Sequence, residues 1–201
     1  MVGGNAAGPS AAAKAKRVDP NADVKMLEAG EFISTGTCEL PYLISGDIDD
    51  YKKIIFFDEK SFFEEKGVDV YIRHKVDSID RKKKTILVTN LKDYSQHIYS
   101  YDKLVLCTGS QVNKIPELTN QLENVFYLKT VGDYLKIKNY CDNNIIKKVL
   151  IIGAGYIGLE AADAFTSQGL KVDLMDKEHY PMPNSEIEVQ NLIAETIREH
   201  G

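Results

Sequence analysis

A glycine-rich hexapeptide that occurs twice is the feature that most constrains the fold of this 201-residue chain. The two copies occupy residues 3–8 and 153–158. The second copy follows a short apolar run, 148–152, which is typical of a fully buried parallel strand. Residues 158–168 read as a helix, and 171–175 read as the next strand. A strand, a glycine turn, a helix and a second strand predict an α/β fold.

Each glycine of this pattern has its own physical role at a pyrophosphate site. The first allows a tight turn, the second lets the backbone approach the phosphates, and the third lets helix and strand pack closely. In the second copy these are Gly153, Gly155 and Gly158, and Gly169 stands where a left-handed residue ends the helix. Asp176 follows Gly158 by 18 residues, near the spacing of about 20 expected for an acid that binds the ribose. This copy therefore predicts a dinucleotide site, and a plain strand-to-helix turn is the alternative.

The first copy departs from the pattern at its centre. Gly3, Gly4 and Gly8 are present, but Asn5 stands where the middle glycine is expected. Asparagine tolerates left-handed geometry, yet we expect its side chain to crowd a phosphate. Glu28 follows Gly8 by 20 residues and is the candidate ribose ligand. A simple surface acid is the alternative for Glu28.

Composition excludes several classes of protein. Lys and Arg total 25 and Asp and Glu total 30, so a net charge of −5 argues against nucleic acid or an anionic membrane as the main partner. The longest uncharged apolar stretch, 149–159, is too short to span a bilayer. Three cysteines without C-x-x-C spacing indicate neither a disulfide framework nor a zinc site, and we expect no metal. The start of the chain lacks the pattern of a signal peptide, so we expect the reducing cytoplasm.

Weaker signals outline the remaining elements. Helices are expected at 9–16 and 131–139, and a last helix is expected from Ser185, where residues 185–188 match a capping box. The basic run 81–84 reads as a solvated turn between strands. Strands are expected at 23–27, 68–72, 85–88, 97–99 and 104–106.

Cys38 differs from the other two cysteines. It follows a polar loop and precedes the apolar run 40–44, so it is a candidate redox nucleophile at a helix start. Cys107 ends the apolar run 104–107 and reads as a small buried side chain. Cys141 reads as an incidental thiol at a helix end.

Four stretches, 3–17, 34–42, 101–110 and 153–160, resemble the FAD-dependent pyridine nucleotide-disulfide oxidoreductases. The resemblance is closest to the branch of coenzyme A-disulfide reductases, NADH oxidases, NADH peroxidases and persulfide reductases. It implies that FAD is held by Gly3, Gly4, Gly8, Glu28, Thr108 and Gly109. It implies that the nicotinamide nucleotide is held by Gly153, Gly155, Tyr156, Ile157, Gly158, Glu160 and Asp176.

Two departures discriminate within that superfamily. The fifth residue after Cys38 is Leu43 rather than a second cysteine, so no internal disulfide can form there. Ala6 replaces the histidine of the peroxidases, which counts against peroxidase activity. A third departure lies within the S-x-x-x-C signature of the coenzyme A-disulfide reductases, which Ser34 and Cys38 match: Thr35 replaces the aromatic residue usual after the serine.

The resemblance also implies how the nucleotide and the substrate are recognised. Asp176 favours NADH over NADPH, because a 2′-phosphate would meet like charge, although Lys177 is a neighbouring cation. The positions implied to contact coenzyme A are Ser10, Lys14, Arg17, Ser34, Thr37 and Lys66. Lys14, Arg17 and Lys66 would neutralise phosphate charge, and ordinary solvated side chains are the alternative.

The resulting prediction is an α/β chain with a Rossmann-like FAD-binding domain and an inserted NAD(P)-binding Rossmann-like domain, both incomplete. The predicted divisions are 1–115 for the first, 116–146 for a connector and 147–201 for the second. The predicted activity passes electrons from NAD(P)H through FAD and Cys38 to a disulfide or persulfide such as coenzyme A disulfide. The alternatives are an NADH oxidase and a non-catalytic nucleotide-binding fragment. The intact protein is expected to be longer and to form a homodimer.

Overall fold

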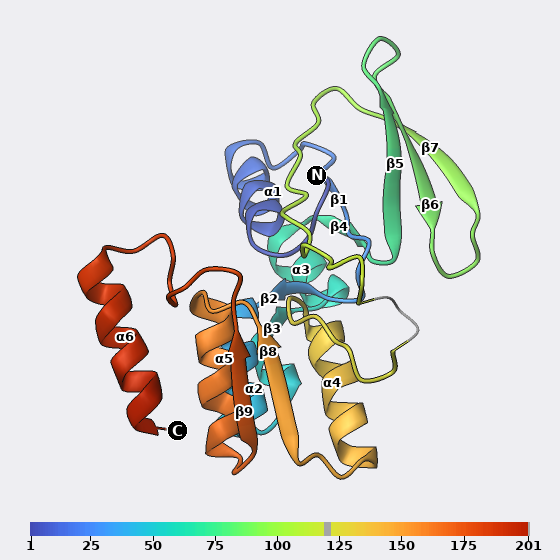
Figure 1. The fold of residues 1–201 in the computed structure, drawn as a ribbon. Helices are drawn as coiled ribbons and strands as arrows, with labels where there is room; N and C mark the ends of the chain where they lie inside the picture. Colours follow the sequence, from blue (N-terminus) through green and yellow to red (C-terminus); the bar gives the residue numbers. More distant parts are fainter. Residues whose placement is uncertain (119–121, 201) are drawn as a thin grey trace. The chain divides into compact units, whose positions relative to one another are not determined.

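The computed structural model describes residues 1–118 and 122–200 (Figure 1). They fold into two compact units. The first unit comprises Met1–Thr37 with Tyr51–Tyr127, and the second comprises Cys38–Asp50 with Leu128–Gly201. These units are groups of packed residues, and the division into two nucleotide-binding domains and a connector stays a prediction.

Parallel strands lie at the centre of the first unit. β1 (Lys25–Leu27) pairs in parallel with β4 (Asp69–Tyr71), and Val2 bridges in parallel to both Leu27 and Leu106. α1 (Ala7–Val18) packs against β1, and α3 (Glu59–Lys66) packs against β4. This arrangement confirms the α/β prediction.

The strand expected at 104–106 is wrong except for the bridge at Leu106. Its partner is Val2, whose N–H donates to the Val105 carbonyl oxygen at 2.9 Å and whose carbonyl oxygen accepts from the Cys107 N–H at 2.7 Å. Leu106 is 57% exposed and Cys107 is only partly buried, so the prediction of a buried run ending in a core cysteine is also wrong for this chain.

The core of the first unit forms under α1. Ala12 and Ala13 are buried, and their small side chains let the helix lie close to Met26 of β1. Phe62 of α3 and Val68 complete this cluster. The alanines of α1 therefore serve packing as well as helix propensity.

Several short elements of the first unit were not predicted from the sequence. β2 (Ile33–Thr35) pairs antiparallel with β3 (Ile55–Phe57), which the 3-10 turn η2 (Tyr51–Ile54) precedes. Three-residue strands are too short to show a period of two, so no sequence pattern predicts them. α3 is short but has a capping box between Asp58 and Ser61.

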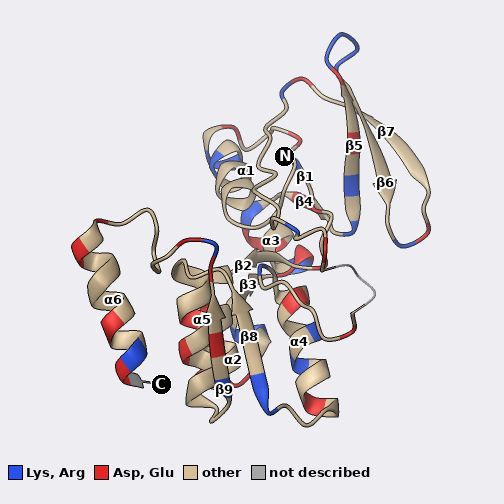
Figure 2. Cartoon of the chain, in the orientation of Figure 1, with Lys and Arg blue, Asp and Glu red and all other residues tan. Residues whose placement is uncertain are grey.

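A three-stranded antiparallel meander completes the unit: β5 (His74–Asp80), β6 (Thr85–Asn90) and β7 (Gln96–Ser100). β6 and β7 match the predicted strands. β5 was not predicted, because a register shift between Val76 and Ser78 breaks its alternation. The basic run 81–84 is exposed at the tip of the β5–β6 hairpin, which confirms the solvated turn (Figure 2).

The second unit contains the other parallel pair. β8 (Lys148–Ile152) and β9 (Lys171–Met175) pair in parallel, and α5 (Tyr156–Ser167) packs against both. α2 (Leu40–Ser45), which follows the 3-10 turn η1 (Thr37–Glu39), packs on α5 and on α4 (Val131–Asn143). The strands, α4 and α5 confirm the predictions closely. Gly169 has a φ of +76°, as expected for the residue after this helix.

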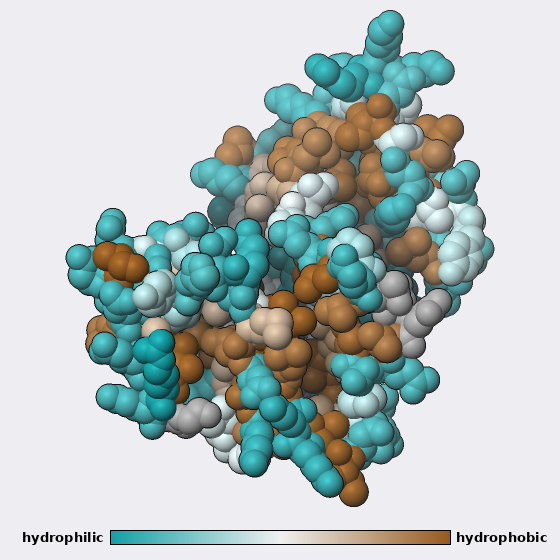
Figure 3. Space-filling view, in the orientation of Figure 1, coloured by the Kyte–Doolittle hydropathy of each residue, from teal (hydrophilic) through white to brown (hydrophobic). Residues whose placement is uncertain are grey.

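The prediction that β8 is fully buried is wrong. Leu150 is 52% exposed, Ile152 is 46% exposed and Met175 of β9 is 53% exposed. These side chains alternate with more buried ones, because α5 covers only one face of the pair. Figure 3 shows apolar side chains gathered over these two strands.

α6 (Ile187–His200) begins two residues later than predicted. Its first turn is closed by a bond from the Gln190 amide to the Glu186 carbonyl oxygen, at 3.1 Å. The Gln190 side chain also donates to the Ser185 carbonyl oxygen, at 2.7 Å, so Ser185 lies outside the helix. None of the helices in the described residues is long and apolar enough to cross a membrane.

The close packing of α5 on β8 gives a direct test of the fold. A Cβ atom on Gly158 would lie 1.8 Å from the Gly153 carbonyl oxygen, whereas one on Gly155 would meet nothing within 4 Å. We expect Gly158→Ala to lower the free energy of unfolding by about 1–3 kcal/mol through overpacking.

The matched control is Gly155→Ala, which should stay within about 1 kcal/mol of the wild type. Urea unfolding followed by circular dichroism measures both. Equal stability of the two variants would contradict the packing described here.

Candidate functional site

The two glycine turns have the same backbone construction. Gly3 has a φ of +104° and Gly153 a φ of +110°, both in the region that favours glycine. The N–H of Gly3 donates to the Leu27 carbonyl oxygen at 2.8 Å, and the N–H of Gly153 donates to that of Met175 at 2.7 Å. Each turn therefore begins hydrogen-bonded to the last residue of the neighbouring strand.

The third glycine is sterically required in both copies. A Cβ on Gly8 would lie 1.8 Å from the Gly3 carbonyl oxygen, as for Gly158 and Gly153 in the second unit. α1 and α5 can therefore start directly against the turn. The first N–H groups of each helix have no partner within the helix, so they can donate hydrogen bonds to an anionic ligand.

The two predicted acids hold the turns in the same way. Glu28 Oε2 accepts from the Gly4 N–H at 2.6 Å, and Oε1 accepts from the Gly30 N–H at 2.6 Å. Asp176 Oδ2 accepts from the Ala154 N–H at 2.6 Å, and Oδ1 accepts from the Glu178 N–H at 2.9 Å. Each carboxylate oxygen keeps a second lone pair, so the acids can also accept from ribose hydroxyls.

These hydrogen bonds also affect the ionisation of Asp176. The Ala154 N–H, followed by the Glu178 N–H, holds the pKa of the Asp176 carboxyl below its usual range, because both bonds favour the charged form. Lys177 lies beside it but pairs with Glu178 at 3.5 Å, on the surface. The carboxylate is thus the stable form of Asp176 at neutral pH.

The second turn fits a dinucleotide. Gly155 has an ordinary φ of −84°, and a Cβ there would enter open space. Neither backbone strain nor internal packing requires glycine at this position, and the open space would let a phosphate approach the backbone closely. Tyr156, Ile157 and Glu160 are exposed at the start of α5, so they are accessible to a ligand of this turn.

The first turn also brings the predicted FAD residues together. The carbonyl oxygen of Cys107 would lie 2.0 Å from a Cβ on Gly3, and the N atom of Thr108 would lie 3.3 Å from it. The stretch predicted to pass beside FAD therefore runs along the turn. Gly109 has a φ of +64° and open space around its missing side chain. These residues fit a flavin dinucleotide, just as the residues of the second turn fit a nicotinamide dinucleotide.

Asn5 is placed differently from the expectation that it crowds a phosphate. Its Oδ1 accepts from the Thr35 N–H at 3.2 Å and from the Thr35 hydroxyl at 2.7 Å. The side chain is therefore held toward β2. No local sequence pattern connects these two residues, because 30 positions separate them.

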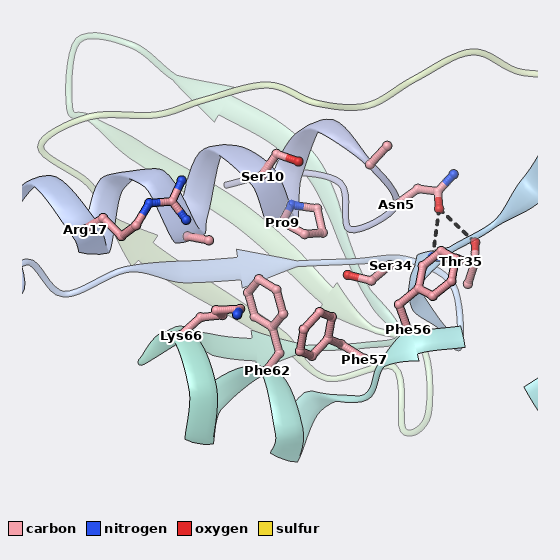
Figure 4. A pocket seen from close by; sticks show the side chains of 12 residues that line it. Asn5, Pro9, Ser10, Arg17, Ser34, Thr35, Phe56, Phe57, Phe62 and Lys66 are labelled. Atoms are coloured by element: carbon pink, nitrogen blue, oxygen red, sulfur yellow. Dashed lines mark hydrogen bonds between the residues drawn. The ribbon is translucent and has the colours of Figure 1, made fainter. Parts of the chain in front are cut away.

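A pocket of about 420 Å³, here called the α1–β2 pocket, lies beside this turn (Figure 4). It brings together four of the six residues predicted to contact coenzyme A: Ser10, Arg17, Ser34 and Lys66. Lys14 is exposed and Thr37 is partly buried, and neither lines the pocket.

The aromatic residues of this pocket were not predicted from the sequence. Phe56, Phe57 and Phe62 line it, and the Phe57 and Phe62 rings meet edge to face at 5.3 Å. Lys66 Nζ lies 5.2 Å from the centre of the Phe57 ring and pairs with Glu65 at 3.2 Å. The pocket therefore offers apolar faces next to positive charge. The sequence feature that could have predicted this aromatic lining is the apolar pair Phe56–Phe57, which the capping box of α3 follows.

The three cysteines lie in different environments. Cys38 is exposed in η1, directly before α2, as the sequence predicts for a thiol at a helix start. Leu43, in the position of a second redox cysteine, is buried in the second unit. Burial, and then Asp142, raise the pKa of the Cys141 thiol, which disfavours its thiolate. Cys38 is thus the most accessible of the three.

The low pKa of Asp176 links stability to pH. Its folded-state pKa lies below the unfolded one, so its contribution is complete above about pH 4 and is lost as pH falls through the folded value. We expect Asp176→Asn to be less stable than the wild type at pH 7, and the difference to shrink in acid. Thermal unfolding from pH 7 to pH 3 measures this.

The control for this prediction is Asp163→Asn, on the exposed side of α5. It should not reproduce the pH-dependent difference. A gap between wild type and Asp176→Asn that stays constant from pH 7 to pH 3 would contradict the role given to these hydrogen bonds.

Curated relatives carry names from one branch of redox enzymes. The chain is 32% identical over 202 residues to "NAD(P)H sulfur oxidoreductase (CoA-dependent)" of Pyrococcus abyssi, which covers 100% of this chain and 44% of the relative. It is 31% identical over 177 residues to "Coenzyme A disulfide reductase" of Staphylococcus aureus strain JH9, which covers 88% of this chain and 40% of the relative. The chain thus spans less than half the length of these relatives.

Solved structures agree with the fold. The water-forming NADH oxidase of Lactobacillus brevis, bound to NADH, has a TM-score of 0.90 and 30% identity; the match covers 100% of this chain and 44% of that one. This likeness confirms an α/β chain that corresponds to the N-terminal part of such enzymes. The family model "Pyridine nucleotide-disulphide oxidoreductase" matches residues 1–201. The chain therefore belongs to the pyridine nucleotide-disulphide oxidoreductases, a family of NAD(P)H-dependent flavoproteins.

Proposed function

We propose that this chain belongs to an oxidoreductase that passes electrons from NADH through FAD and Cys38 to a disulfide or persulfide such as coenzyme A disulfide. The observation that carries the proposal is the α1–β2 pocket, which unites Ser10, Arg17, Ser34 and Lys66 beside the first glycine turn. These side chains suit a ligand with phosphate groups and an apolar or aromatic part. Two relatives whose names include coenzyme A support this reading.

The two glycine turns would hold the two nucleotides. Gly3, Gly4, Gly8 and Glu28, with Thr108 and Gly109, would hold FAD. Gly153, Gly155, Gly158 and Asp176, with Tyr156, Ile157 and Glu160 nearby, would hold the nicotinamide nucleotide. When bound, FAD supplies the exchange of an electron pair between nicotinamide and sulfur. In the proposed architecture the NAD(P)-binding domain is inserted into the FAD-binding domain.

Cys38 would supply the sulfur chemistry. Its thiolate attacks one sulfur of the substrate disulfide, the sulfur–sulfur bond of the substrate breaks, a mixed disulfide forms with Cys38, and the other sulfur leaves as a thiolate that takes a proton from water. Reduction of this mixed disulfide by two electrons returns the Cys38 thiolate and releases the second thiol. Because Leu43 stands where other members of the superfamily have a second cysteine, the oxidised form must involve a sulfur or oxygen from outside.

A second candidate function is the reduction of dioxygen, as in an NADH oxidase. The likeness to the Lactobacillus brevis enzyme favours it. The same thiol would then be oxidised by oxygen chemistry rather than by a disulfide. A third candidate is a nucleotide-binding fragment without turnover.

We further propose that the complete enzyme is a homodimer.

Replacing the proposed nucleophile tests the mechanism. Cys38→Ser should lower turnover of coenzyme A disulfide on the order of 10³-fold or more, since a serine hydroxyl is not ionised near neutral pH and cannot exchange with sulfur. FAD content and reduction of the flavin by NADH should stay near the wild-type values. The assay uses the longest protein that the gene encodes.

The controls are the other two cysteines. Cys107→Ser should cost about 1 kcal/mol of stability and little activity, because its side chain is only partly buried. Cys141→Ser should leave activity unchanged. Near-normal disulfide turnover in Cys38→Ser, with a loss in either control, would show that the wrong cysteine was chosen.

Nucleotide preference tests the second turn. Under anaerobic conditions NADH should bleach the flavin at least tenfold faster than NADPH, because like charges placed together cost several kcal/mol. Asp176→Asn should narrow this ratio, since it removes the charge that repels a 2′-phosphate. Stopped-flow absorbance gives both rates. An equal or reversed preference in the wild type would refute the assignment of Asp176.

A further inference from the structure

Three hydrogen bonds join the first glycine turn to strand β2. Asn5 Oδ1 accepts two of them, from the N–H of Thr35 at 3.2 Å and from its hydroxyl at 2.7 Å. The Gly4 carbonyl oxygen accepts the third, from the N–H of Ser34 at 2.8 Å. Two consecutive residues of the turn therefore bind two consecutive residues of the strand.

Ser34 is the strained member of this group. Its φ of +49° lies in the left-handed region, which a residue with a Cβ adopts only where neighbouring contacts hold it there. The bonds to Gly4 and Asn5 act on Ser34 itself and on the residue that follows it. Together with the pairing of Ile33 and Thr35 to β3, these bonds oppose its relaxation to an extended conformation.

The strained conformation has a consequence for the α1–β2 pocket. Ser34 is 8% exposed, and its side chain points into the space between Pro9 and the Phe57 and Phe62 rings (Figure 4). The backbone conformation of a strand residue sets the face of the strand to which its side chain points. A change in that conformation therefore redirects the side chain. The direction of the Ser34 hydroxyl thus depends on the turn that these hydrogen bonds hold.

We propose that Asn5 is a positioning residue, which acts through Thr35 to keep Ser34 left-handed and its hydroxyl in the α1–β2 pocket. The proposal rests on the proposed function in taking this pocket as the substrate site. It gives a reason for the departure from glycine at position 5, because glycine has no side-chain acceptor for Thr35. The first turn would thereby fix part of the substrate pocket as well as bind a nucleotide.

Amide hydrogen exchange measured by NMR in this 201-residue chain tests whether Asn5 holds Thr35 and Ser34 in place. Asn5→Ala should speed exchange at the Thr35 and Ser34 amides by about tenfold, the loss expected for one net hydrogen bond. Asn5→Asp keeps an acceptor oxygen and should retain the protection. Asn5→Gly, which restores the usual glycine, is a second variant should Asn5→Ala fold poorly. Unchanged protection in Asn5→Ala and Asn5→Gly would overturn the proposal.

Steady-state kinetics tests the functional half in the longest protein that the gene encodes, loaded with FAD. Asn5→Gly should raise KM for coenzyme A disulfide about tenfold while kcat and FAD content stay within about twofold. Asn5→Gln, which keeps an uncharged amide acceptor, should return KM toward the wild-type value, which a general loss of stability would not allow. An unchanged KM, or loss of FAD in place of a change in KM, would overturn the positioning role.

The two proposals fail in different ways. If the wild-type protein does not turn over coenzyme A disulfide, the proposed function fails. The exchange measurement still decides whether Asn5 holds Ser34, because it requires neither substrate nor cofactor. Faster exchange with an unchanged KM would reject the link to the substrate while leaving the role of Cys38 intact.

Discussion

The contact between the third glycine of each turn and the carbonyl oxygen of the first is the constraint on which the rest of the structure depends. A Cβ on Gly8 or Gly158 would lie only 1.8 Å from that oxygen. Because both positions lack a side chain, α1 and α5 begin directly against the turns. The helix N–H groups, the turn backbone and the acid of the next strand then meet at one place. The nucleotide chemistry of the family follows from this shared geometry.

The two turns share this geometry but differ in how they connect to their surroundings. In the second turn, Gly155 faces open space, which leaves room for a ligand to approach the backbone. In the first turn, Asn5 occupies the same place and binds Thr35 of β2. The first turn is therefore part of a larger pocket that includes Arg17 and Lys66. The same local motif thus leaves open space at its middle position in one case and lines a pocket in the other.

The three cysteines show that sequence context and structural environment contribute separately to the reactivity of a thiol. The exposure of Cys38 before α2 agrees with its sequence context. Cys107 follows an apolar run, yet it is only partly buried, and its segment forms an isolated bridge to Val2 rather than a regular strand. Burial raises the pKa of Cys141, so accessibility and ionisation disfavour it as a nucleophile. Chemical reactivity therefore requires the fold as well as the residue type.

The sequence by itself determined the elements whose signals are local: β8, β9, α4, α5, the two glycine turns and the acids Glu28 and Asp176. Each depends on residues a few positions apart, or on a turn of fixed length before an acid. Only the tertiary structure decided the direction of Asn5, the left-handed turn at Ser34, the aromatic wall of the α1–β2 pocket and the exposure of Leu150 and Ile152 on β8. These features depend on contacts between residues far apart in the chain. Neither helical nor strand periodicity carries information about such contacts, because periodicity reports which face of an element is apolar and not what that face will meet.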